Sequence, residues 1–454
     1  MPFFILAVFF IAWTSWKKLD VATALIAVVL FSTLPIVLGH AGLATNDMAV
    51  TATVFMALVS MLLWYENPEP GYGILAGLAV ALALLSKFSA VVYLTAGGLL
   101  AVGWLIWQER GDLRIREKLA GIPVILLVSF FVLWGGYRFS IGPFWIDRYE
   151  IYNETINRYV GSSGTLHDLV YAVIKAPVYP AIEFVQGIIH VAHHNAIGHR
   201  SYFMGEISEF GWWNFFLVGT FVKTPLAFLA LTGTGIVSIF SSRISKQQKQ
   251  WLILFLIIVA SFFLSTLTVN INIGIRHILP VFPFLSVIAA AGFMYLWRMD
   301  RYYVVARSAA IILLSGCLIA SVRAHPDYFS YFNIFADDNP EDFLINSDLD
   351  WGQDLLRLEH VLLEKDINEL YLVYFGSADI ERFDLPPVKK LEPGQQARGW
   401  IAISMRRLRD DGSTSPPYDG YRWLEKFEPV ERIGRSIYLY KITDNILDKT
   451  VNRQ

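Results

Sequence analysis

Residues 48–65 read MAVTATVFMALVSMLLWY, a run without one charged side chain. A helix needs about 20 apolar residues to cross the hydrocarbon core of a bilayer, and this run nearly reaches that length. The whole chain of 454 residues shares the bias, because 55% of its residues are hydrophobic and only 17% are charged. Soluble domains average about 45–50% apolar and about 25% charged residues. The run therefore predicts a membrane-spanning helix in a chain that is largely embedded in a membrane.

Further apolar runs of similar length occur on both sides of residues 48–65. We expect an α-helical polytopic membrane protein with about ten transmembrane helices. The expected spans are 1–16, 20–39, 48–65, 72–86, 88–107, 119–137, 212–240, 251–269, 279–298 and 306–323. The first and fourth of these spans are short, and the fourth is rich in Gly and Ala, which favours close helix packing.

Lys and Arg in short loops predict the orientation of the spans, since they collect on the cytoplasmic side. If Lys17 and Lys18 are cytoplasmic, the short loops of the opposite side contain only Lys87 and Arg276. The cytoplasmic side then also holds Arg110, Arg114, Arg116, Lys118, Arg243, Lys246, Lys249, Arg298, Arg301 and Arg307. This predicts a multi-pass protein of the inner (cytoplasmic) membrane, with the segment 138–211 and the tail after Arg323 outside.

The predicted domain boundary lies at residue 323. Residues 1–323 form the transmembrane domain, including the segment 138–211, whose aromatic residues favour interfacial helices over an external cavity. Residues 324–454 have a soluble composition and predict a small extracytoplasmic α/β domain. Apolar residues at helical spacing mark 350–365, and strand-like runs occur at 370–376, 400–405 and 437–442.

Some classes of partner and site find no support in the sequence. No basic stretch is dense enough to follow a nucleic-acid backbone, so no nucleic-acid partner is expected. The single cysteine, Cys317, excludes an intramolecular disulfide and indicates a packing residue. A cluster of external polar residues includes zinc-ligand types, but adjacent histidines cannot share a helix face, and interface or acceptor contacts are favoured. Its members are His190, His193, His194, His199, Glu206 and Glu209.

Two ionisable residues lie at the external ends of apolar spans, where charges are costly. Asp47 begins the span 48–65 and is a candidate catalytic base or metal ligand; the alternative is that Asn46 or Asp47 caps the helix. Lys223 lies in the apolar stretch FFLVGTFVKTPLAF and is a candidate phosphate ligand. The alternative for Lys223 is a side chain that extends to the membrane interface.

Two further groups of polar residues are candidates for the same external site. Arg276 and His277 are the titratable residues of one external loop, and a guanidinium there suits a phosphate, although both residues could simply anchor a helix end. The stretch NSDLDWGQDLLRL, residues 346–358, places several polar side chains where a helix begins. Carboxylates stabilise helix N-termini on their own, so this stretch has a purely structural alternative. Its candidate site-lining residues are Asp348, Asp350, Trp351, Gln353 and Asp354.

Taken together, these segments resemble membrane glycosyltransferases of family 39, of the GT-C fold class, which includes dolichyl-phosphate-mannose protein mannosyltransferases. The resemblance covers nearly the whole chain. The stretches that carry it are GHAGLATNDMAVTATVF (39–55), GLAVALALLSKFSAV (77–91), GHRSYFMGEISEFGWWNFFLVGTFVKTPLAFL (198–229), RHILPVFPFL (276–285), and DYFSYFN (327–333) with NSDLDWGQDLLRL (346–358).

The resemblance implies transfer of a sugar, such as mannose, from a polyprenyl phosphate to an acceptor hydroxyl on a protein, lipid or polysaccharide of the cell envelope. Protein O-glycosylation is one such reaction. The resemblance implies an inverting displacement at the extracytoplasmic face, with Asp47 as the catalytic residue. Lys223, Arg276 and His277 would bind the donor phosphate, while His199, Glu206 and the residues of 346–358 would line the site. No cofactor is required; a divalent metal near Asp47 is left open, and no metal ligand is assigned.

The resemblance aligns the first predicted span with the second span of the family. The family's leading candidate base is an acidic residue in the loop before that span, so the resemblance implies that residues 1–454 lack this loop, as in a fragment, a chain with a misplaced start or one half of a split system. Two other functions stay open. A multi-pass transporter would place polar residues near the bilayer midplane and carry an internal repeat. A non-catalytic or truncated membrane subunit would lack the base.

Overall fold

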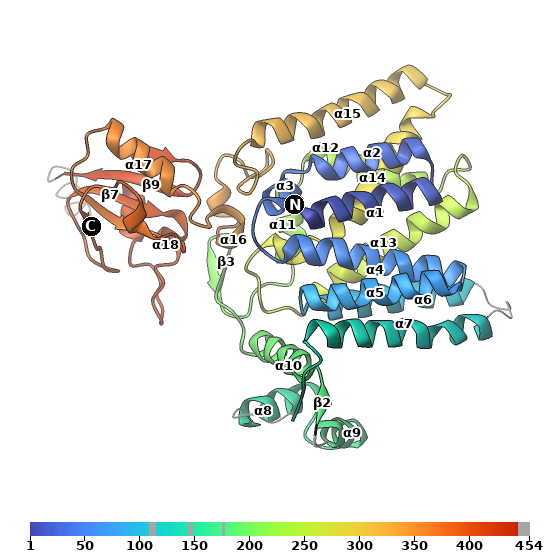
Figure 1. The fold of residues 1–454 in the computed structure, drawn as a ribbon. Helices are drawn as coiled ribbons and strands as arrows, with labels where there is room; N and C mark the ends of the chain where they lie inside the picture. The colour runs from blue at the N-terminus through green and yellow to red at the C-terminus, as the bar shows by residue number, and fades with distance from the viewer. Residues whose placement is uncertain (109–114, 144–148, 175–177, 444–454) are drawn as a thin grey trace.

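The computed structural model describes residues 1–108, 115–143, 149–174 and 178–443; Arg110, Arg114 and the end of the predicted C-terminal domain lie outside these ranges. Long helices lie side by side in a bundle, and a small mixed sheet forms a separate unit at one end of this bundle (Figure 1). The first half of the bundle consists of α1 (Pro2–Lys18), α2 (Val21–Ser32), α3 (Pro35–Ala41), α4 (Asp47–Glu66), α5 (Pro70–Ser86), α6 (Ala90–Gln108) and α7 (Ile115–Gly136).

The second half of the bundle contains a sharp break. Its helices are α11 (Phe215–Lys223), α12 (Leu226–Ser238), α13 (Lys246–Thr266), α14 (Val281–Trp297) and α15 (Tyr303–Ala324). The span expected over 212–240 contains this break, because α11 and α12 meet at 111°. Thr224 is extended (φ −114°, ψ 135°), as Pro225 requires of the residue before it. The span expected at 20–39 is likewise bent, by 66° between α2 and α3.

The helices confirm a multi-pass membrane protein, while the number of spans stays a prediction. Among the described residues, 4 helices are long and apolar enough to cross a membrane, or up to 6 when each bent pair is one span. These 4 are α4, α6, α13 and α15. Three shorter apolar helices accompany them, at Pro70–Ser86, Gly121–Gly136 and Val281–Trp297. The remaining expected span, 1–16, falls on α1.

Helix α4 forms the centre of the bundle. Protein buries 94% of its most apolar window, and it packs against α1, α5, α6 and α14. An apolar residue therefore suits nearly every position, which explains why the sequence 48–65 shows no polar face. Glycines let neighbouring helices approach: a Cβ on Gly292 of α14 would lie 2.1 Å from the Leu231 carbonyl oxygen of α12. The long α15, in contrast, has only 22% of its window buried.

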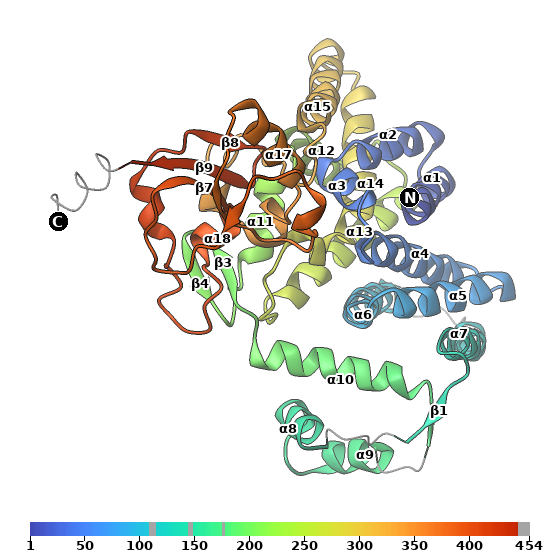
Figure 2. The same cartoon turned by 60° about the vertical axis from the view of Figure 1, so that its left-hand side comes forward.

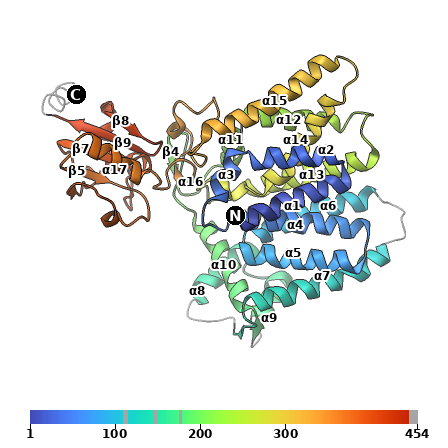
Figure 3. The same cartoon turned by 45° about the horizontal axis from the view of Figure 1, so that its top comes forward.

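Three amphipathic helices lie at the end of the bundle where α7 stops, the same end as the C-terminal unit (Figures 1 and 3). They are α8 (Tyr149–Val160), α9 (Thr165–Ile174) and α10 (Ile182–Ile197). A two-stranded pair, β1 (Ile141–Gly142) with β2 (Tyr179–Pro180), connects them to α7, and the hairpin β3 (Ser201–Phe203) with β4 (Glu206–Ser208) follows α10. Figure 2 shows α10 crossing below the bundle.

The C-terminal unit contains a five-stranded sheet in the order β6-β5-β7-β9-β8. Strand β5 is parallel to β6 and β7, whereas β9 is antiparallel to β7 and β8. The expected strands at 370–376, 400–405 and 437–442 are confirmed as β5 (Leu370–Val373), β7 (Gly399–Ser404) and β9 (Ile437–Ile442). The expected helix is α17 (Leu355–Glu364), whose Leu355, Leu358 and Leu362 pack on the sheet. The other elements are β6 (Val388–Lys389), β8 (Glu431–Ile433) and α18 (Met405–Arg409).

Short helical turns occur before α14, between α15 and α17, and within the C-terminal unit. They are η1 (Ile275–Ile278) before α14, η2 (Pro340–Asp342), α16 (Asn346–Leu349), η3 (Ile380–Arg382) and η4 (Arg422–Lys426). The segment after α15 returns over the end of the bundle, where the backbone of Phe329 lies against α3. A Cβ on Gly39 would come within 2.9 Å of the Phe329 Cα, so glycine is needed for this approach.

Candidate functional site

Charged and polar side chains from α3, α4, η1 and the residue after α5 meet at the N-terminal end of α4. We call His40, Asp47, Lys87, Arg276 and His277 the Asp47 cluster. Lys87 Nζ donates a hydrogen bond to Asp47 Oδ1 at 2.7 Å, and Arg276 lies 3.8 Å from Asp47 Oδ2. The Asp47 side chain is fully buried, whereas Lys87 and Arg276 keep about one fifth of their surface (19% and 20%) exposed. The carboxylate therefore lies beneath two cations that solvent or a ligand can reach.

The capping alternative for Asp47 is wrong. The N-cap of α4 is Asn46, and no side-chain hydrogen bond caps this helix. Asp47 is the first helical residue, so its carboxylate also gains from the positive end of the helix dipole. Its Oδ1 is used by Lys87, and its buried Oδ2 has no hydrogen-bond partner among the described residues. Asp47 therefore forms an ion pair with Lys87 and does not cap the helix through a side-chain hydrogen bond.

Lys87 was not recognised as a site residue in the sequence. It follows α5 directly, at the C-cap, and its side chain reaches the start of α4 because the two helices are antiparallel neighbours. The signal for Lys87 was present, since the loop rule left only Lys87 and Arg276 on the predicted outer side. Lys87 pairs with the same carboxylate as Arg276, so it joins a residue that was already a candidate phosphate ligand.

Arg276 and His277 of η1 lie in the cluster but contribute differently. The Arg276 guanidinium stacks over the Trp351 ring at 4.9 Å, and Trp351 stacks in turn on Phe329 at 5.3 Å. The pKa of His277 is lowered well below its usual value, first by burial and then by the nearby Lys87 and Arg276. His277 is therefore neutral near pH 7 and adds no positive charge for a phosphate.

Lys223 is placed away from any exposed surface. Its side chain is almost fully buried, at 1% exposure. The ammonium donates to the carbonyl oxygens of Phe329 and Asp348, at 2.7 and 2.6 Å, and faces the Phe332 ring at 4.3 Å. In this arrangement Lys223 joins α11 to the segment after α15 and to α16. Its interfacial alternative is wrong, and its role as a phosphate ligand stays a prediction.

The residues of 346–358 divide into two groups. Asp348 Oδ1 accepts a hydrogen bond from the Ile275 N–H at 2.9 Å, and burial raises the pKa of this carboxyl group. Asp348 thereby fixes η1, which carries Arg276. Trp351 lies directly beneath that guanidinium. These two residues shape the Asp47 cluster by positioning Arg276.

The other three residues of this stretch bind backbone groups of the stretch itself and of the C-terminal unit. Asp350 accepts hydrogen bonds from the N–H groups of Gly352 and Arg406, at 3.1 and 3.0 Å. Asp354 accepts from the N–H groups of Arg435 and Ser436, both at 3.0 Å. Gln353 accepts from the Trp351 N–H and donates to the Leu349 carbonyl oxygen, both at 2.8 Å. The structural alternative describes these three residues well.

The predicted acceptor residues lie at the edge of the cluster or beyond it. His199 contacts His194 at 3.1 Å between ring nitrogens, and its pKa is lowered by burial and by neighbouring positive groups that include Arg276. Glu206 is exposed on the β3–β4 hairpin. Within the described ranges, no group of three or more His, Cys, Asp or Glu side chains is placed to hold a metal ion.

Several buried polar atoms around the Asp47 cluster have no hydrogen-bond partner among the described residues. Such atoms are rare in folded proteins unless water or a ligand satisfies them. They are both ring nitrogens of His40, Oδ2 of Asp47, Nε of Arg276, Nε2 of His277 and Oδ2 of Asp348. Donors and acceptors are both present, so the site suits a ligand that combines anionic oxygens with hydroxyl groups.

The chain is similar to known proteins in parts of its sequence and structure. The chain is similar to the crystal structure of ArnT from Cupriavidus metallidurans bound to undecaprenyl phosphate, with a TM-score of 0.46 and 13% identity over 96% of this chain and 82% of that one. No curated protein matches it. Residues 3–134, which contain His40, Asp47 and Lys87, match the family model described as dolichyl-phosphate-mannose-protein mannosyltransferase. The resemblance seen in the sequence is therefore confirmed, and over residues 3–134 the chain is similar to the dolichyl-phosphate-mannose-protein mannosyltransferase family.

Proposed function

We propose that this membrane protein is a glycosyltransferase that moves a sugar, such as mannose, from a polyprenyl phosphate to an acceptor hydroxyl. The observation that supports it most is the Asp47 cluster: two partly exposed cations over one buried carboxylate, surrounded by unsatisfied polar atoms. The family match over residues 3–134 supports the same chemistry, because it includes both members of the Lys87–Asp47 pair.

The charge of the cluster favours an anionic ligand. Lys87 and Arg276 each carry one positive charge, Asp47 carries one negative charge, and His277 is neutral, which leaves an excess of one positive charge (2 − 1 = 1). A phosphate diester would neutralise this excess when it binds. The leaving phosphate gains a further negative charge as the bond to the sugar breaks, so the same two cations stabilise the product side of the reaction.

The proposed reaction is a single inverting displacement. The acceptor oxygen forms a bond to the anomeric carbon, the bond between that carbon and the phosphate oxygen breaks, and the hydroxyl proton passes to a base. Polyprenyl phosphate leaves with both electrons of the broken bond. Arg276 suits the phosphate because its planar guanidinium, oriented by Trp351, can donate two parallel hydrogen bonds.

Asp47 has two proposed roles that an experiment can separate. It was expected to be the catalytic base, yet it is buried and Lys87 already occupies Oδ1. We therefore propose that Asp47 first positions Lys87 and Arg276. Asp47→Asn should then raise the KM for the donor while kcat stays within a few-fold. A collapse of kcat at an unchanged donor KM would instead assign Asp47 as the base.

The experiment that tests the proposal is transfer from a radiolabelled polyprenyl-phosphate sugar by the full chain in nanodiscs. Lys87→Ala and Arg276→Ala should each abolish most of the transfer. Lys246→Ala is the matched control, because Lys246 is an exposed lysine at the start of α13, distant in the fold from α4's first residue. Equal transfer by all three variants would contradict the site. Sugar uptake into vesicles without transfer would favour the transporter alternative.

The finer features of this activity are also proposals. We place the reaction at the extracytoplasmic face of the inner membrane, because the loop rule puts Lys87 and Arg276 on that side. The C-terminal α/β unit lies at the same end of the bundle as α3 and α16 (Figure 1), where it is suited to contact a protein, lipid or polysaccharide acceptor. Transfer without added metal and in the presence of a chelator is the expected result.

A further inference from the structure

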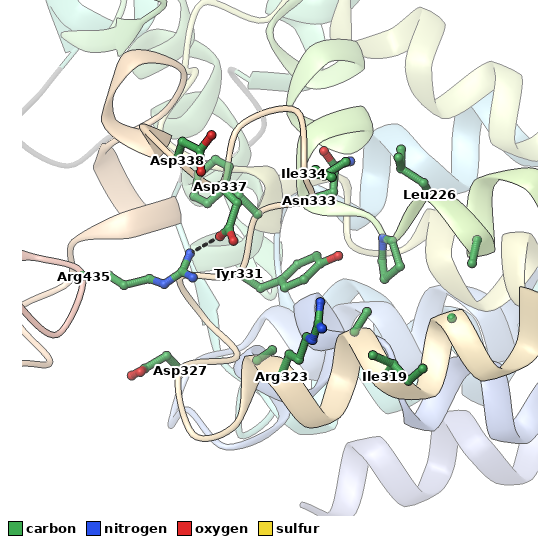
Figure 4. A pocket seen from close by; sticks show the side chains of 16 residues that line it. Leu226, Ile319, Arg323, Asp327, Tyr331, Asn333, Ile334, Asp337, Asp338 and Arg435 are labelled. Atoms are coloured by element: carbon green, nitrogen blue, oxygen red, sulfur yellow. Dashed lines mark hydrogen bonds and ion pairs between the residues drawn. The ribbon is translucent and has the colours of Figure 1, made fainter.

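A separate cavity lies between α12, α15 and the segment that follows α15. Its volume is about 560 Å³, and its lining contains no residue of the Asp47 cluster. Leu226, Ala227, Gly316, Ile319 and Ala320 form one half of the wall, and all of these residues are apolar or without a side chain. Figure 4 shows the polar residues on the other side of the cavity, toward the C-terminal unit. The cavity is thus apolar at its membrane side and polar at its outer side.

The apolar half of the cavity opens toward lipid. Ile319 is 52% exposed and lies on α15, whose other large exposed residues include Ile312 and Val322. In a multi-pass membrane protein such an exposed apolar helix face contacts acyl chains. A lipid tail can therefore enter the space between α12 and α15 from the side, without leaving the bilayer.

The polar half contains one uncompensated charge of each sign. Arg435 and Asp337 pair at 2.7 Å, and Asp327 pairs with Arg357 at 2.8 Å. Among the described residues, the side chains of Arg323 and Asp338 form no ion pair or hydrogen bond, although both line the cavity. Figure 4 shows the Arg323 side chain rising from α15 between Ile319 and Tyr331. These two free charges are the ones a ligand can satisfy.

The order of these groups matches one class of lipid. From the membrane side outward, the lining runs from Ile319 to Arg323, four residues further along α15, and then to Asp338 beyond the end of that helix. A zwitterionic phospholipid presents acyl chains, a phosphate and an ammonium group in the same order. We propose that this cavity binds phosphatidylethanolamine, with its phosphate on Arg323 and its ammonium group toward Asp338.

The site is independent of the proposed sugar transfer. Asn333 closes one side of the cavity by donating to the carbonyl oxygens of Phe221 and Thr224, at 2.6 and 3.0 Å. These contacts connect the cavity wall to the break between α11 and α12. A bound phospholipid therefore fills the space beside this break and stabilises the segment after α15 against the bundle.

Native mass spectrometry of the full chain, extracted in detergent with defined lipids, tests the proposal. The wild type should retain one phosphatidylethanolamine in preference to phosphatidylglycerol at equal concentration. Arg323→Gln should reduce this retention about tenfold or more, since it removes a charge-assisted contact. Arg301→Gln is the matched control, because Arg301 is an exposed arginine just before the other end of α15. Asp338→Asn should remove the preference over phosphatidylglycerol.

A second variant tests the apolar half. Ala320→Leu fills the space between α12 and α15 and should lower retention even though both charges remain. Three outcomes would overturn the proposal: equal retention by Arg323→Gln and the wild type, equal binding of phosphatidylglycerol, or displacement of the lipid by inorganic phosphate alone. Displacement by undecaprenyl phosphate at equal concentration would assign the cavity to the donor lipid and would also contradict it.

Discussion

Replacing Lys87 with Met tests the Asp47 cluster most directly, because it removes a charge and keeps most of the side-chain volume. Asp47 is fully buried and 2.7 Å from the Lys87 ammonium. Removing one partner of a buried pair typically costs about 3–5 kcal/mol, since the other charge is left unpaired. Arg276, at 3.8 Å from the free oxygen, offsets part of this cost. We therefore expect Lys87→Met to lower the free energy of unfolding by about 3 kcal/mol.

The double variant Lys87→Met with Asp47→Asn separates stability from function. It leaves no unpaired carboxylate, so at least half of the lost stability should return. Donor binding should not return, because the phosphate has still lost one of its two cations. A lost contact to a charged group of about 1.5–3 kcal/mol corresponds to roughly 10- to 100-fold weaker binding.

Cys317 makes the stability assay simple. It is the only cysteine of the chain and is buried in α15, at 2% exposure, so a thiol-reactive fluorescent dye reports unfolding without further engineering. Donor affinity is measured on the same preparations with a labelled polyprenyl phosphate. The reasoning is refuted if Lys87→Met unfolds at the wild-type temperature, or if the double variant recovers donor binding together with stability.

Three further results are expected. Trp351→Ala should weaken donor use several-fold, because the Arg276 guanidinium loses the ring that orients it. Trp351→Phe should recover most of that loss. No difference in donor use between the two variants would contradict the stacking role. Lys223→Met should destabilise the fold, since two carbonyl oxygens lose their donor, and this is measured with the Cys317 dye; a stable variant with weak donor binding would instead favour a phosphate ligand. Burial raises the pKa of Asp350 from 3.8 to about 6, so the unfolding temperature should fall as the pH rises from about 4 to 6. Asp350→Asn should flatten this change. An equal pH dependence of the unfolding temperature in both proteins would contradict the role of Asp350.

The sequence predicts the helices well wherever burial is uniform. Residues 48–65 form α4 because protein surrounds that helix on nearly all sides, so composition alone identifies it. The break within 212–240 was not predicted, because the apolar residues continue on both sides of Thr224 and Pro225, and hydropathy does not register a change of direction. The strands β6 and β8 were missed, since two- and three-residue strands have too few residues to show alternation.

The candidate site was predicted in part. Asp47 and Arg276 are recognisable because charges are rare at the ends of apolar spans. The partners of Lys223 are not, because backbone carbonyl groups at residues 329 and 348 leave no trace in the amino-acid sequence. The role of Asp354 was not recognisable for the same reason. Its carboxylate accepts hydrogen bonds from the backbone of Arg435 and Ser436, and this contact forms only in the folded C-terminal unit.

The enclosure of α4 also decides how the protein responds to the thickness of its membrane. A helix in contact with lipid tilts or shifts when its apolar length and the bilayer differ. Helices α15 and α6 should respond to such a difference, because only 22% and 33% of their most apolar windows are buried in protein. Neighbouring helices separate α4 from lipid, since 94% of its most apolar window is buried. Asp47 is the first residue of α4. Thicker or thinner bilayers should therefore reorient the periphery while the carboxylate keeps its depth and its two cations.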